Sequence, residues 1–395
     1  MKREGDKLKV LHIYRTYFPD PPGGLQEAIR QISLATRECG VESKIFVLSP
    51  EPLPPEIALP EGVVVRSKSW AAPASCDLGG LDSLWRYREL SAWADVLHFH
   101  FPWPFGDLLR VFGGSNKPAV MTYHSDIVRQ RHLGYVYGPL MRRMLGSMSA
   151  VVATSPAYAK SSPVLTTVVR PERVRVIPLG IGDYAHSAAS DQLGPNLLTR
   201  LPLGDKPYLL SLGVLRYYKG LHTLVEAAPS IPANLVIAGS GPEMERLKSL
   251  AAQVGASNVI FAGQVSSEEK IALLKGCCAM VLPSQMRSEA FGMVLVEASM
   301  FSKPMVCCEI GSGTSYVNED GVTGFVVPPE NPQALARAVN VLLNDEARSV
   351  GMGRAARARY ERLFSAPALG AAYCDLYDSV VMNRSNAQKV APSGL

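Results

Sequence analysis

The sequence lacks the features that mark several large classes of protein. None of its apolar stretches approaches the ~20 residues that a helix needs to cross a bilayer, so we expect no membrane-spanning segment. The first residues, MKREGDKLKVLHIY, contain too short an apolar run for a secretory signal. These two absences predict a cytoplasmic protein that is either soluble or peripheral to a membrane.

Metal-ligand spacing and strong charge are also missing. The seven cysteines, including the neighbours Cys277-Cys278 and Cys307-Cys308, show no pattern typical of a zinc site. We expect most of them to be buried, reduced thiols, as in a reducing compartment. The net charge of +5 is small and its basic residues are scattered, which argues against a nucleic-acid partner.

One segment, RQRHLGYVYGPLMRR at 129–143, concentrates cationic side chains with two tyrosines. A helix with one solvated basic face is one interpretation. A surface that rests on anionic lipid headgroups is the other.

Short β-branched runs alternate with longer helical patterns along the whole chain, which predicts parallel strands joined by crossover helices. We expect a first domain over 1–185, a Gly/Ser/Asp/Pro-rich linker over 186–206 and a second domain over 207–365. Residues 366–395 should form a helix that returns to the first domain, and then a frayed tail. The fold class is α/β, with two doubly wound domains whose ligands bind beyond the carboxyl ends of the strands. The expected strands are 9–14, 43–49, 63–67, 95–100, 118–124, 150–155 and 174–180 in the first domain, and 207–213, 234–241, 258–263, 279–284, 304–309 and 324–329 in the second.

The stretch SEAFGMVLVEASM, 288–300, places a glutamate in a helix that looks buried. Helical spacing puts four apolar side chains on the side of Glu297, namely Met293, Val294, Met300 and Phe301. A carboxylate on such a face needs hydrogen-bond donors, because stripping its water is costly. A polyhydroxylated ligand could supply them. A backbone amide or a neighbouring lysine could do so as well.

Glu289 lies at or just before the start of the same helix. The amides of Ala290 to Met293 should then lack helical partners and favour an anion or a sugar oxygen. Gly292 would let a ligand come close to the backbone. Eight helical residues rise about 12 Å, so Glu289 and Glu297 could address opposite ends of one extended ligand. In the alternative interpretation, Glu289 only interacts with the helix dipole.

A strand-to-helix turn, LGVLRYYKGL at 212–221, brings Arg216 and Lys219 to the end of the first strand of the second domain. Such a position suits a diphosphate, although a basic pair in a loop is often simply solvated. The later AGSGPEME has only two of the three glycines of a dinucleotide fingerprint, so a nicotinamide cofactor is not expected.

The first domain offers a Pro/Gly turn and a histidine at strand ends. In PDPPGGLQ, Gly23 and Gly24 would allow close approach to bare backbone amides. His124, in TYHSD, would face the ligand site, whereas a structural role is the alternative. Three further histidines lie inside the expected strands and are interpreted as satisfied core residues, namely His12, His98 and His100.

Taken together, these motifs resemble those of the retaining glycosyltransferases of family 4, which have the GT-B fold of two Rossmann-like domains. EAFGMVLVE is similar to the family's E-x7-E signature. The PPGG loop, YHSD, VIPLG, LRYYKG, AGSGPE and GFVVPP occur in the family's order and cover almost the whole chain. TYHSDIVRQ, SPAYAKSSPVL and GVLRYYKGLHTLVEA look like the bacterial lipopolysaccharide and O-antigen enzymes that transfer mannose or rhamnose from GDP-sugars.

The resemblance implies a role for each candidate residue. Glu297 would hold the ribose of a nucleotide sugar, and Arg216 and Lys219 would neutralise its diphosphate. The family often has an arginine directly after the strand glycine, where this chain has Val214, so the part assigned to Arg216 departs from the family pattern. His124 and Glu289 would be the catalytic residues at the reacting sugar. The amides of Phe291, Gly292 and Met293 would bind the donor sugar. Gly24 would approach the diphosphate, and Val265 would contact the base.

The implied reaction transfers a glycosyl group with retention of the anomeric configuration and needs no metal or other cofactor; the sequence has no Asp-x-Asp metal motif. Its partners would be a GDP-sugar and a lipid-linked oligosaccharide at the cytoplasmic face of the membrane. The alternatives are a UDP-sugar-dependent glycosyltransferase of polysaccharide synthesis, a nucleotide-sugar epimerase or another GT-B enzyme, and a catalytically silent binder of sugar nucleotides.

Overall fold

The computed structural model describes residues 7–20, 23–72, 76–126, 131–185, 198 and 200–390, with side chains described for all of these except 131–136 and 386–390. The chain divides into two compact units. Unit 1 comprises Met1–Gly182 and Ala366–Leu395, and unit 2 comprises Asp183–Ser365. Most of the predicted linker, 186–206, lies outside the described residues.

Unit 1 is built on a sheet that runs in the order β3-β4-β2-β1-β6-β7-β8-β9 over the described residues. Its strands are parallel except β3 and β5, which pair antiparallel with β4. The sequence did not predict these two short strands. The strands are β1 (Leu8–Ile13), β2 (Val41–Ser49), β3 (Glu56–Leu59), β4 (Gly62–Ala71), β5 (Leu78–Gly79), β6 (Val96–Phe101), β7 (Ala119–Tyr123), β8 (Ala150–Ala153) and β9 (Val174–Val176).

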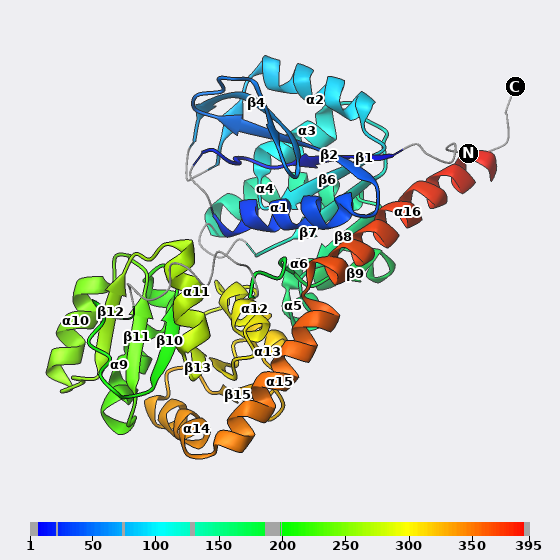
Figure 1. Ribbon diagram of the computed structural model, residues 1–395. Coiled ribbons are helices and arrows are strands. Elements are labelled where there is room, and N and C mark those ends of the chain that lie inside the picture. The colour runs from blue at the N-terminus through cyan, green and yellow to red at the C-terminus, as the bar shows by residue number, and fades with distance from the viewer. Residues whose placement is uncertain are drawn as a thin grey trace, which may run out of the picture. The chain divides into compact units, whose positions relative to one another are not determined.

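Helices cover both faces of this sheet. The C-terminal helix α16 lies beside α1 on one face (Figure 1). There Tyr373 and Tyr377 of α16 pack against a cluster that includes Val10, Val96 and Val120, so the last helix completes the core of unit 1. The helices are α1 (Gly24–Arg37), α2 (Leu81–Trp93), α3 (Pro104–Phe112), α4 (Arg131–Gly146), α5 (Pro156–Ser161), α6 (Pro163–Thr167), the 3-10 turn η2 (Pro171–Arg173) and α16 (Ala366–Val390).

Unit 2 has an all-parallel sheet in the order β12-β11-β10-β13-β14-β15. Its four central strands are buried along their whole length, which is why they read as continuous apolar runs. The strands are β10 (Tyr208–Leu212), β11 (Asn234–Ala238), β12 (Val259–Gly263), β13 (Ala279–Leu282), β14 (Met305–Cys308) and β15 (Gly324–Val327).

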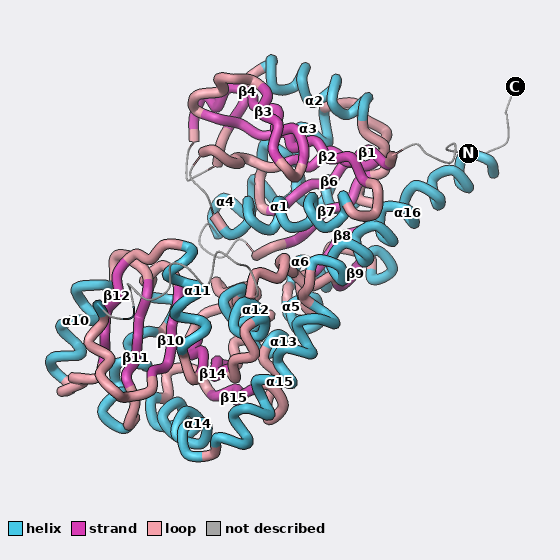
Figure 2. Tube along the Cα trace, in the orientation of Figure 1, coloured by secondary structure: helices cyan, strands magenta, loops and turns pink. Residues whose placement is uncertain are grey.

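The helices of unit 2 surround its strands, as Figure 2 shows. Side chains of α9, α10 and α14 form one core with the sheet. Helix α11 begins with a capping box between Ser266 and Glu269, which satisfies two amides that the first turn leaves free. The helices are η3 (Tyr217–Lys219), α9 (Leu221–Ala227), η4 (Ala228–Ser230), α10 (Met244–Gln253), α11 (Ser267–Gly276), α12 (Met293–Met300), α13 (Thr314–Val317), α14 (Pro332–Asn344) and α15 (Glu346–Leu363).

The predicted α/β class with two doubly wound domains is confirmed. In each sheet the chain starts at a central strand, builds outward on one side and then returns to the other side, as in Rossmann folds. The reversal falls between β1 and β6 in unit 1 and between β10 and β13 in unit 2. These are the places where ligands bind in such sheets.

Three of the seven cysteines are buried, fewer than the sequence predicted. Cys277, Cys307 and Cys308 are buried, and burial raises the pKa of each of these thiols to about 12. They are therefore protonated and unreactive at neutral pH, whereas Cys39 is exposed. Over the described part of the chain, no helix combines the length and the apolar character needed to cross a membrane.

We predict that Gly370→Ala destabilises unit 1, because a Cβ at Gly370 of α16 would lie 2.5 Å from the carbonyl oxygen of Ala35 in α1. Such overpacking costs about 1–3 kcal/mol. All four tryptophans lie in unit 1, so urea unfolding followed by tryptophan fluorescence reports this unit. The matched control is Gly351→Ala in α15, where a Cβ meets nothing within 4 Å and which should not shift that transition. An unchanged midpoint for Gly370→Ala would contradict the close contact.

Candidate functional site

The reversal point of unit 2 gathers two loops that carry predicted site residues. One loop follows β10 and contains Lys219, and the other follows the neighbouring strand β13 and contains Glu289. Gln285 joins them, since its backbone amide donates to the carbonyl of Tyr218 at 2.9 Å and its side chain donates to that of Tyr217 at 3.1 Å. The two loops therefore hold each other in place at the carboxyl edge of the sheet.

Lys219 and Glu289 form an ion pair. The Lys219 ammonium lies 2.5 Å from Oε2 of Glu289, and both side chains are largely buried, at 12% and 11% exposed. The hydroxyl of Ser284 donates to the same oxygen at 3.2 Å. Removing one partner would leave the other charge partly buried and unpaired. The sequence assigned these two residues to separate groups of a ligand, and the structure shows that they also bind each other.

The helix that follows Glu289 begins later than predicted. Helix α12 starts at Met293, and Gly292 before it has a left-handed φ of 84°. A Cβ at Gly292 would meet the side chains of Leu282, Leu295 and Thr314 at 3.2–3.3 Å. The backbone and the core therefore require this glycine, whether or not a ligand approaches it. The span from Glu289 to Glu297 is only partly helical, so the 12 Å rise does not apply.

The donor-binding candidates beside Gly292 differ in what they expose. Phe291 is 3% exposed and its ring lies edge-on to Phe364, with the ring centres 6.0 Å apart. Its side chain belongs to the core, so only its backbone could meet a ligand. Met293 is half-buried at the helix start, where the first amides of a helix lack partners within it.

Glu297 has two protein partners. Its Oε1 accepts a hydrogen bond from the Lys270 ammonium of α11 at 2.6 Å and from the Tyr184 hydroxyl at 2.8 Å. The Glu297 side chain is 15% exposed and that of Lys270 is 31% exposed. The neighbouring lysine, one of the two alternatives drawn from the sequence, is thus present. The glutamate is at the half-buried rim rather than on a fully buried face.

The two glutamates share a feature. The bonds that the structure shows to Glu289 end on Oε2, and those to Glu297 end on Oε1. Among the described residues no bond is made to the second oxygen of either carboxylate. Each can therefore accept a hydroxyl from a ligand without losing its protein partner.

Arg216 and Val265 lie in two loops of the same sheet edge, one after β10 and one after β12, with β11 between these strands. Arg216 is exposed directly before η3, and among the described residues it makes no ion pair. Its charge is therefore available to an anion, unlike that of Lys219. Val265 is half-buried between β12 and α11, directly before the cap residue Ser266.

In unit 1, Gly24 is the first residue of α1, after the loop that follows β1. A Cβ there would meet nothing within 4 Å, so the start of this helix is open. Residues 21 and 22 of the predicted PPGG loop lie outside the described residues. The fold therefore puts Gly24 at the carboxyl edge of the sheet of unit 1, as the strand order requires.

His124 ends a chain of buried histidines. Its Nε2 is 3.1 Å from Nδ1 of His100, and Nε2 of His100 is 3.1 Å from Nδ1 of His12. The three residues come from β1, β6 and the end of β7, which are adjacent strands. His124 is 4% exposed and the other two are 2% or less. His12 is only partly satisfied, contrary to the prediction, because its buried Nε2 has no hydrogen-bond partner among the described residues.

The acidic residue close to His124 in the sequence binds elsewhere. Oδ1 of Asp126 accepts hydrogen bonds from the hydroxyls of Tyr123 at 3.0 Å and Ser162 at 2.6 Å. The histidine chain, rather than Asp126, is what the structure shows at the His124 ring. The sequence feature that pointed to the histidine chain is the alternation in VLHFHF of β6, which puts His98 and His100 on one face of the sheet.

Burial keeps these rings neutral. It lowers the pKa of His12 and of His124 to about 3, and the pKa of His98 and of His100 falls well below its usual value for the same reason. A protonated ring inside this cluster would lose its water without gaining a counter-ion.

A metal is the other group that clustered histidines could hold. Ring nitrogens of His12, His98 and His100 come within 4.8 Å of one another. His98, however, uses Nδ1 for the Tyr377 hydroxyl at 2.8 Å and Nε2 for the Thr122 hydroxyl at 2.7 Å. A metal would have to break one of these bonds, so the cluster fits a hydrogen-bonded network better than a metal site.

Sequence reasoning also missed a buried acid at this edge. Asp107 lies in the first turn of α3, after β6. Burial raises its pKa to about 7, while a hydrogen bond from the Tyr137 hydroxyl opposes that rise.

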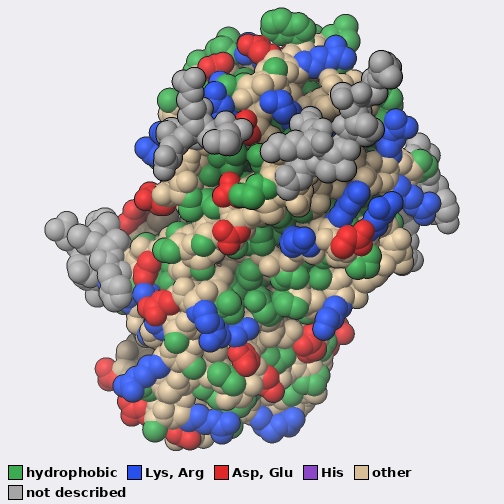
Figure 3. Space-filling view, turned by 90° about the vertical axis from the view of Figure 1, so that its right-hand side faces the viewer, with side chains coloured by type: hydrophobic (Ala, Val, Ile, Leu, Met, Phe, Trp, Pro, Cys, Tyr) green, Lys and Arg blue, Asp and Glu red, His purple; other side chains and the backbone are tan. Residues whose placement is uncertain are grey.

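The basic segment 129–143 is described only in part: α4 covers 131–146, and Arg142 and Arg143 at its far end are exposed. On the face shown in Figure 3, basic and acidic side chains are interspersed rather than gathered into one basic patch.

Two family models match the chain. One, described as glycosyl transferases group 1, matches residues 199–359 in unit 2. The other, described as Glycosyltransferase Family 4, matches residues 22–183 in unit 1. Together they span most of both units.

Curated proteins match over nearly the full length. The chain is 43% identical over 359 residues to the D-rhamnosyltransferase WbpZ of Pseudomonas aeruginosa, which covers 91% of this chain and 93% of that protein. It is 37% identical over 378 residues to the O-antigen chain mannosyltransferase C of Escherichia coli, with 96% and 100% covered.

Solved structures share the fold. A sucrose-phosphate synthase from Thermosynechococcus elongatus superposes with a TM-score of 0.76 at 22% identity, covering 95% of this chain and all of that one. HepE of Anabaena in complex with UDP gives a TM-score of 0.76 at 19% identity, covering 94% of this chain and all of that one. At these identities the likeness concerns the fold alone.

We predict that His124→Asn weakens the pH dependence of the stability of unit 1. A histidine whose pKa is about 3 when folded and 6.5 when unfolded contributes stability above pH 6.5, and that stability is lost as the pH falls toward 3. Between pH 7 and pH 5 the loss is about 2 kcal/mol for one such ring. Urea unfolding followed by tryptophan fluorescence at both pH values measures it. His222→Asn, in unit 2, is the control, and equal pH slopes for the wild type and His124→Asn would rule out a neutral His124.

Proposed function

The chain belongs to the family of group 1 and family 4 glycosyltransferases, and from that premise we propose that it moves a mannose or D-rhamnose residue from a GDP-sugar to a lipid-linked oligosaccharide of an O-antigen. The transfer retains the anomeric configuration. The observation that carries the proposal is the identity of 43% and 37% to a D-rhamnosyltransferase and an O-antigen chain mannosyltransferase over more than nine-tenths of the chain.

The names of these two relatives agree on one kind of sugar. D-Rhamnose is 6-deoxy-D-mannose, so both donors have the same configuration at C2, C3 and C4 and differ only by the hydroxyl at C6. A site that binds the ring hydroxyls of one sugar binds those of the other. We therefore expect the specificity of this chain to lie within that pair, and the acceptor, presented at the cytoplasmic face of the membrane, to be the growing glycan.

Unit 2 supplies the groups for the nucleotide sugar. Glu297 accepts the ribose hydroxyls through its Oε2, while Oε1 keeps its bonds to Lys270 and Tyr184. Val265, in the loop before α11, contacts the base. The amides of Phe291, Gly292 and Met293 meet the sugar at the start of α12, where helix geometry favours oxygen ligands.

The diphosphate meets two different cations. Lys219 is already paired with Glu289 at 2.5 Å, whereas Arg216 is exposed and makes no ion pair among the described residues. Arg216 therefore supplies the first net positive charge, even though Val214 stands where the family often has arginine. An ammonium has three donors, so Lys219 can add a bond to phosphate without leaving Glu289.

The reaction breaks the bond between the anomeric carbon and the diphosphate oxygen. Negative charge grows on the leaving phosphate, and fixed cations and amides stabilise that charge more in the transition state than in the ground state. The leaving phosphate takes the proton of the acceptor hydroxyl on the same face of the sugar. Neither glutamate acts as a covalent nucleophile in this scheme, and no metal takes part.

In unit 1, His124 bonds to the reacting sugar and Gly24 brings the bare amides of the start of α1 to the diphosphate. Both lie at the carboxyl edge of the sheet of unit 1. The neutral state that burial imposes on His124 makes it a hydrogen-bond partner for a hydroxyl rather than a counter-ion.

The proposed donor is tested by thermal unfolding with GDP, GDP-mannose, GDP-D-rhamnose, UDP and UDP-glucose, followed by transfer to a lipid-linked acceptor. A ligand that binds only the folded state at about 100 times its Kd adds about 2.7 kcal/mol of stability. We expect the GDP compounds to raise the Tm most and GDP-mannose or GDP-D-rhamnose to support transfer. A larger shift with UDP compounds would overturn the donor. Conversion of the sugar nucleotide without acceptor would indicate an epimerase.

Substitution of the two glutamates should change different quantities, donor affinity for Glu297 and turnover for Glu289. We predict that Glu297→Gln raises the Kd of the nucleotide sugar about tenfold or more, because a hydrogen bond to a charged group contributes about 1.5–3 kcal/mol. Glu289→Gln should instead mainly lower kcat, because it disturbs Lys219 at the leaving phosphate. Titration calorimetry and initial rates separate the two. Glu245→Gln, an exposed glutamate of α10, is the control, and equal losses of affinity in both variants would refute the division of roles.

A further inference from the structure

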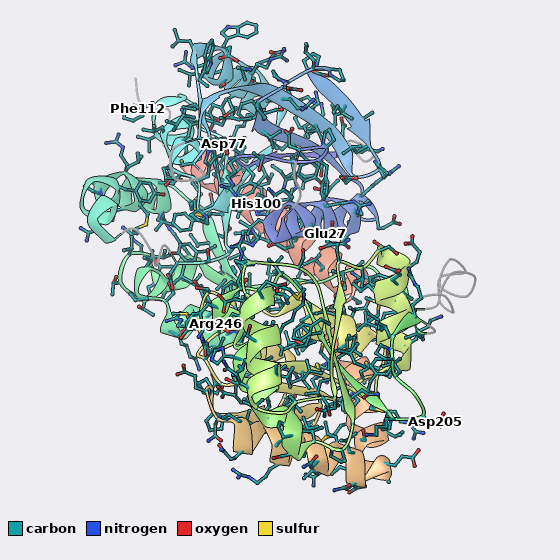
Figure 4. All side chains as sticks on the ribbon, turned by 90° about the vertical axis from the view of Figure 1, so that its left-hand side faces the viewer. Glu27, Asp77, His100, Phe112, Asp205 and Arg246 are labelled. Carbon is teal, nitrogen blue, oxygen red and sulfur yellow. The ribbon has the colours of Figure 1, made fainter. Side chains whose placement is uncertain are left out.

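The histidine chain of unit 1 leaves one ring nitrogen at each of its two ends outside the bonds between the rings. Along the chain, Nδ1 of His12 meets Nε2 of His100, and Nδ1 of His100 meets Nε2 of His124, each at 3.1 Å. The nitrogen left over at the end near the loop is Nδ1 of His124. Figure 4 shows His100 in the interior of unit 1, while Phe112 lies at its surface.

Neutral rings allow only two proton arrangements in this chain. A neutral imidazole has one N–H and one lone pair, and each bond between two rings needs one of each. Either every ring donates toward His124, which leaves a proton on its Nδ1, or every ring donates toward His12, which leaves a lone pair there. Because the bonds are in series, fixing the proton on one ring fixes it on all three.

The buried end of the chain selects between the two arrangements. Nε2 of His12 is buried and has no hydrogen-bond partner among the described residues. Donation toward His12 would place an N–H at this position, and buried N–H groups without a partner are rarer than under-used acceptors. Donation toward His124 leaves only a lone pair there, so this direction is favoured.

Neighbouring groups hold the rings but do not enter the chain. His98 stacks on His100, with ring centres 4.2 Å apart, and its own two nitrogens bond to the hydroxyls of Tyr377 and Thr122. Thr122 in turn bonds to the Tyr373 hydroxyl at 2.8 Å. This second network connects β6 and β7 with α16, and it packs against the three-ring chain through His98.

We propose that His12 and His100 are positioning residues that fix His124 in the Nδ1–H tautomer, so that His124 presents a hydrogen-bond donor to an oxygen of the sugar substrate. Neither residue touches the substrate. Their effect passes through the ring of His124, as the partner of a catalytic histidine sets its tautomer in other enzymes. The identity of that substrate rests on the function proposed above, whereas the tautomer does not.

The tautomer can be observed directly in the wild-type protein. In protein labelled with ¹⁵N at its seven histidines, the two ring nitrogens of each histidine show which of them carries the proton. The signals of the chain are assigned by comparison with His12→Asn and His124→Asn. We expect Nδ1–H for His12, His100 and His124 at pH 7. Observation of Nε2–H for His124 would overturn the proposal whatever the activity of the protein.

The activity test uses two replacements at His100. His100→Leu removes the bond to His124, and we expect kcat to fall about ten- to hundredfold with less than about a threefold change in the donor KM, and His124 to show both tautomers. His100→Asn keeps an amide N–H that can donate, so it should recover part of kcat together with the Nδ1–H signal. An unchanged kcat in folded His100→Leu, or a loss without any change at His124, would contradict the positioning role.

The matched control is Tyr377→Phe. It removes a buried hydroxyl from the second network, where it bonds to His98 at 2.8 Å, and leaves the three-ring chain intact. It should leave kcat and the His124 signals unchanged, although it destabilises the same core. If no sugar nucleotide is turned over by the wild type, the proposed function fails while the tautomer measurement still decides the inference.

Discussion

Both sheets of this protein depend on one constraint, namely that parallel strands can be joined only by crossovers. The chain has to leave each parallel strand at the same edge of the sheet and return at the opposite edge. Since the strand order reverses between β1 and β6 and between β10 and β13, the loops on either side of each reversal diverge. The candidate residues Lys219, Glu289 and His124 lie in loops at these edges, just after the strands that carry them there.

The candidate polar groups have hydrogen-bond or ion-pair partners within the protein. Lys219 pairs with Glu289, Glu297 pairs with Lys270, and His124 bonds to His100. Each pair joins residues from different elements: the first joins two loops, the second joins helices α11 and α12, and the third joins β6 to the end of β7. A buried polar group without a partner is costly, and the edge that would bind a ligand is therefore structured before any ligand arrives.

Much of the fold could be predicted because it follows from local patterns. The parallel strands are β-branched apolar runs bounded by turn residues, and the order of helices and strands indicated doubly wound domains. The short strand β3 was missed since Glu56–Leu59 alternates exposed and half-buried residues at a sheet edge. The start of α12 was misplaced because nothing in the sequence shows that Gly292 takes a left-handed φ.

The candidate site was predictable in its residue types and not in its contacts. Glu289 and Glu297 could be singled out from one helix pattern. Their partners Lys219 and Lys270 lie 70 and 27 residues away, and only the strand order brings them together. The histidine chain was harder still, because it requires the register of three strands at once. His12 lies opposite His98 and His100 lies opposite Thr122, and each ring was interpretable alone as a core residue.

The pairing of Lys219 with Glu289 also bears on how this edge could stabilise a leaving group. A lone buried lysine would bind the diphosphate tightly before the reaction and so lower the energy of the ground state as well as that of the transition state. Only an interaction that strengthens along the reaction raises the rate. In the proposed reaction, a lysine shared with a carboxylate binds the ground-state diphosphate less than a lone lysine would, and its bond to phosphate strengthens as negative charge grows there while it keeps its bond to Glu289. The ion pair therefore suits differential stabilisation better than two separate charges would.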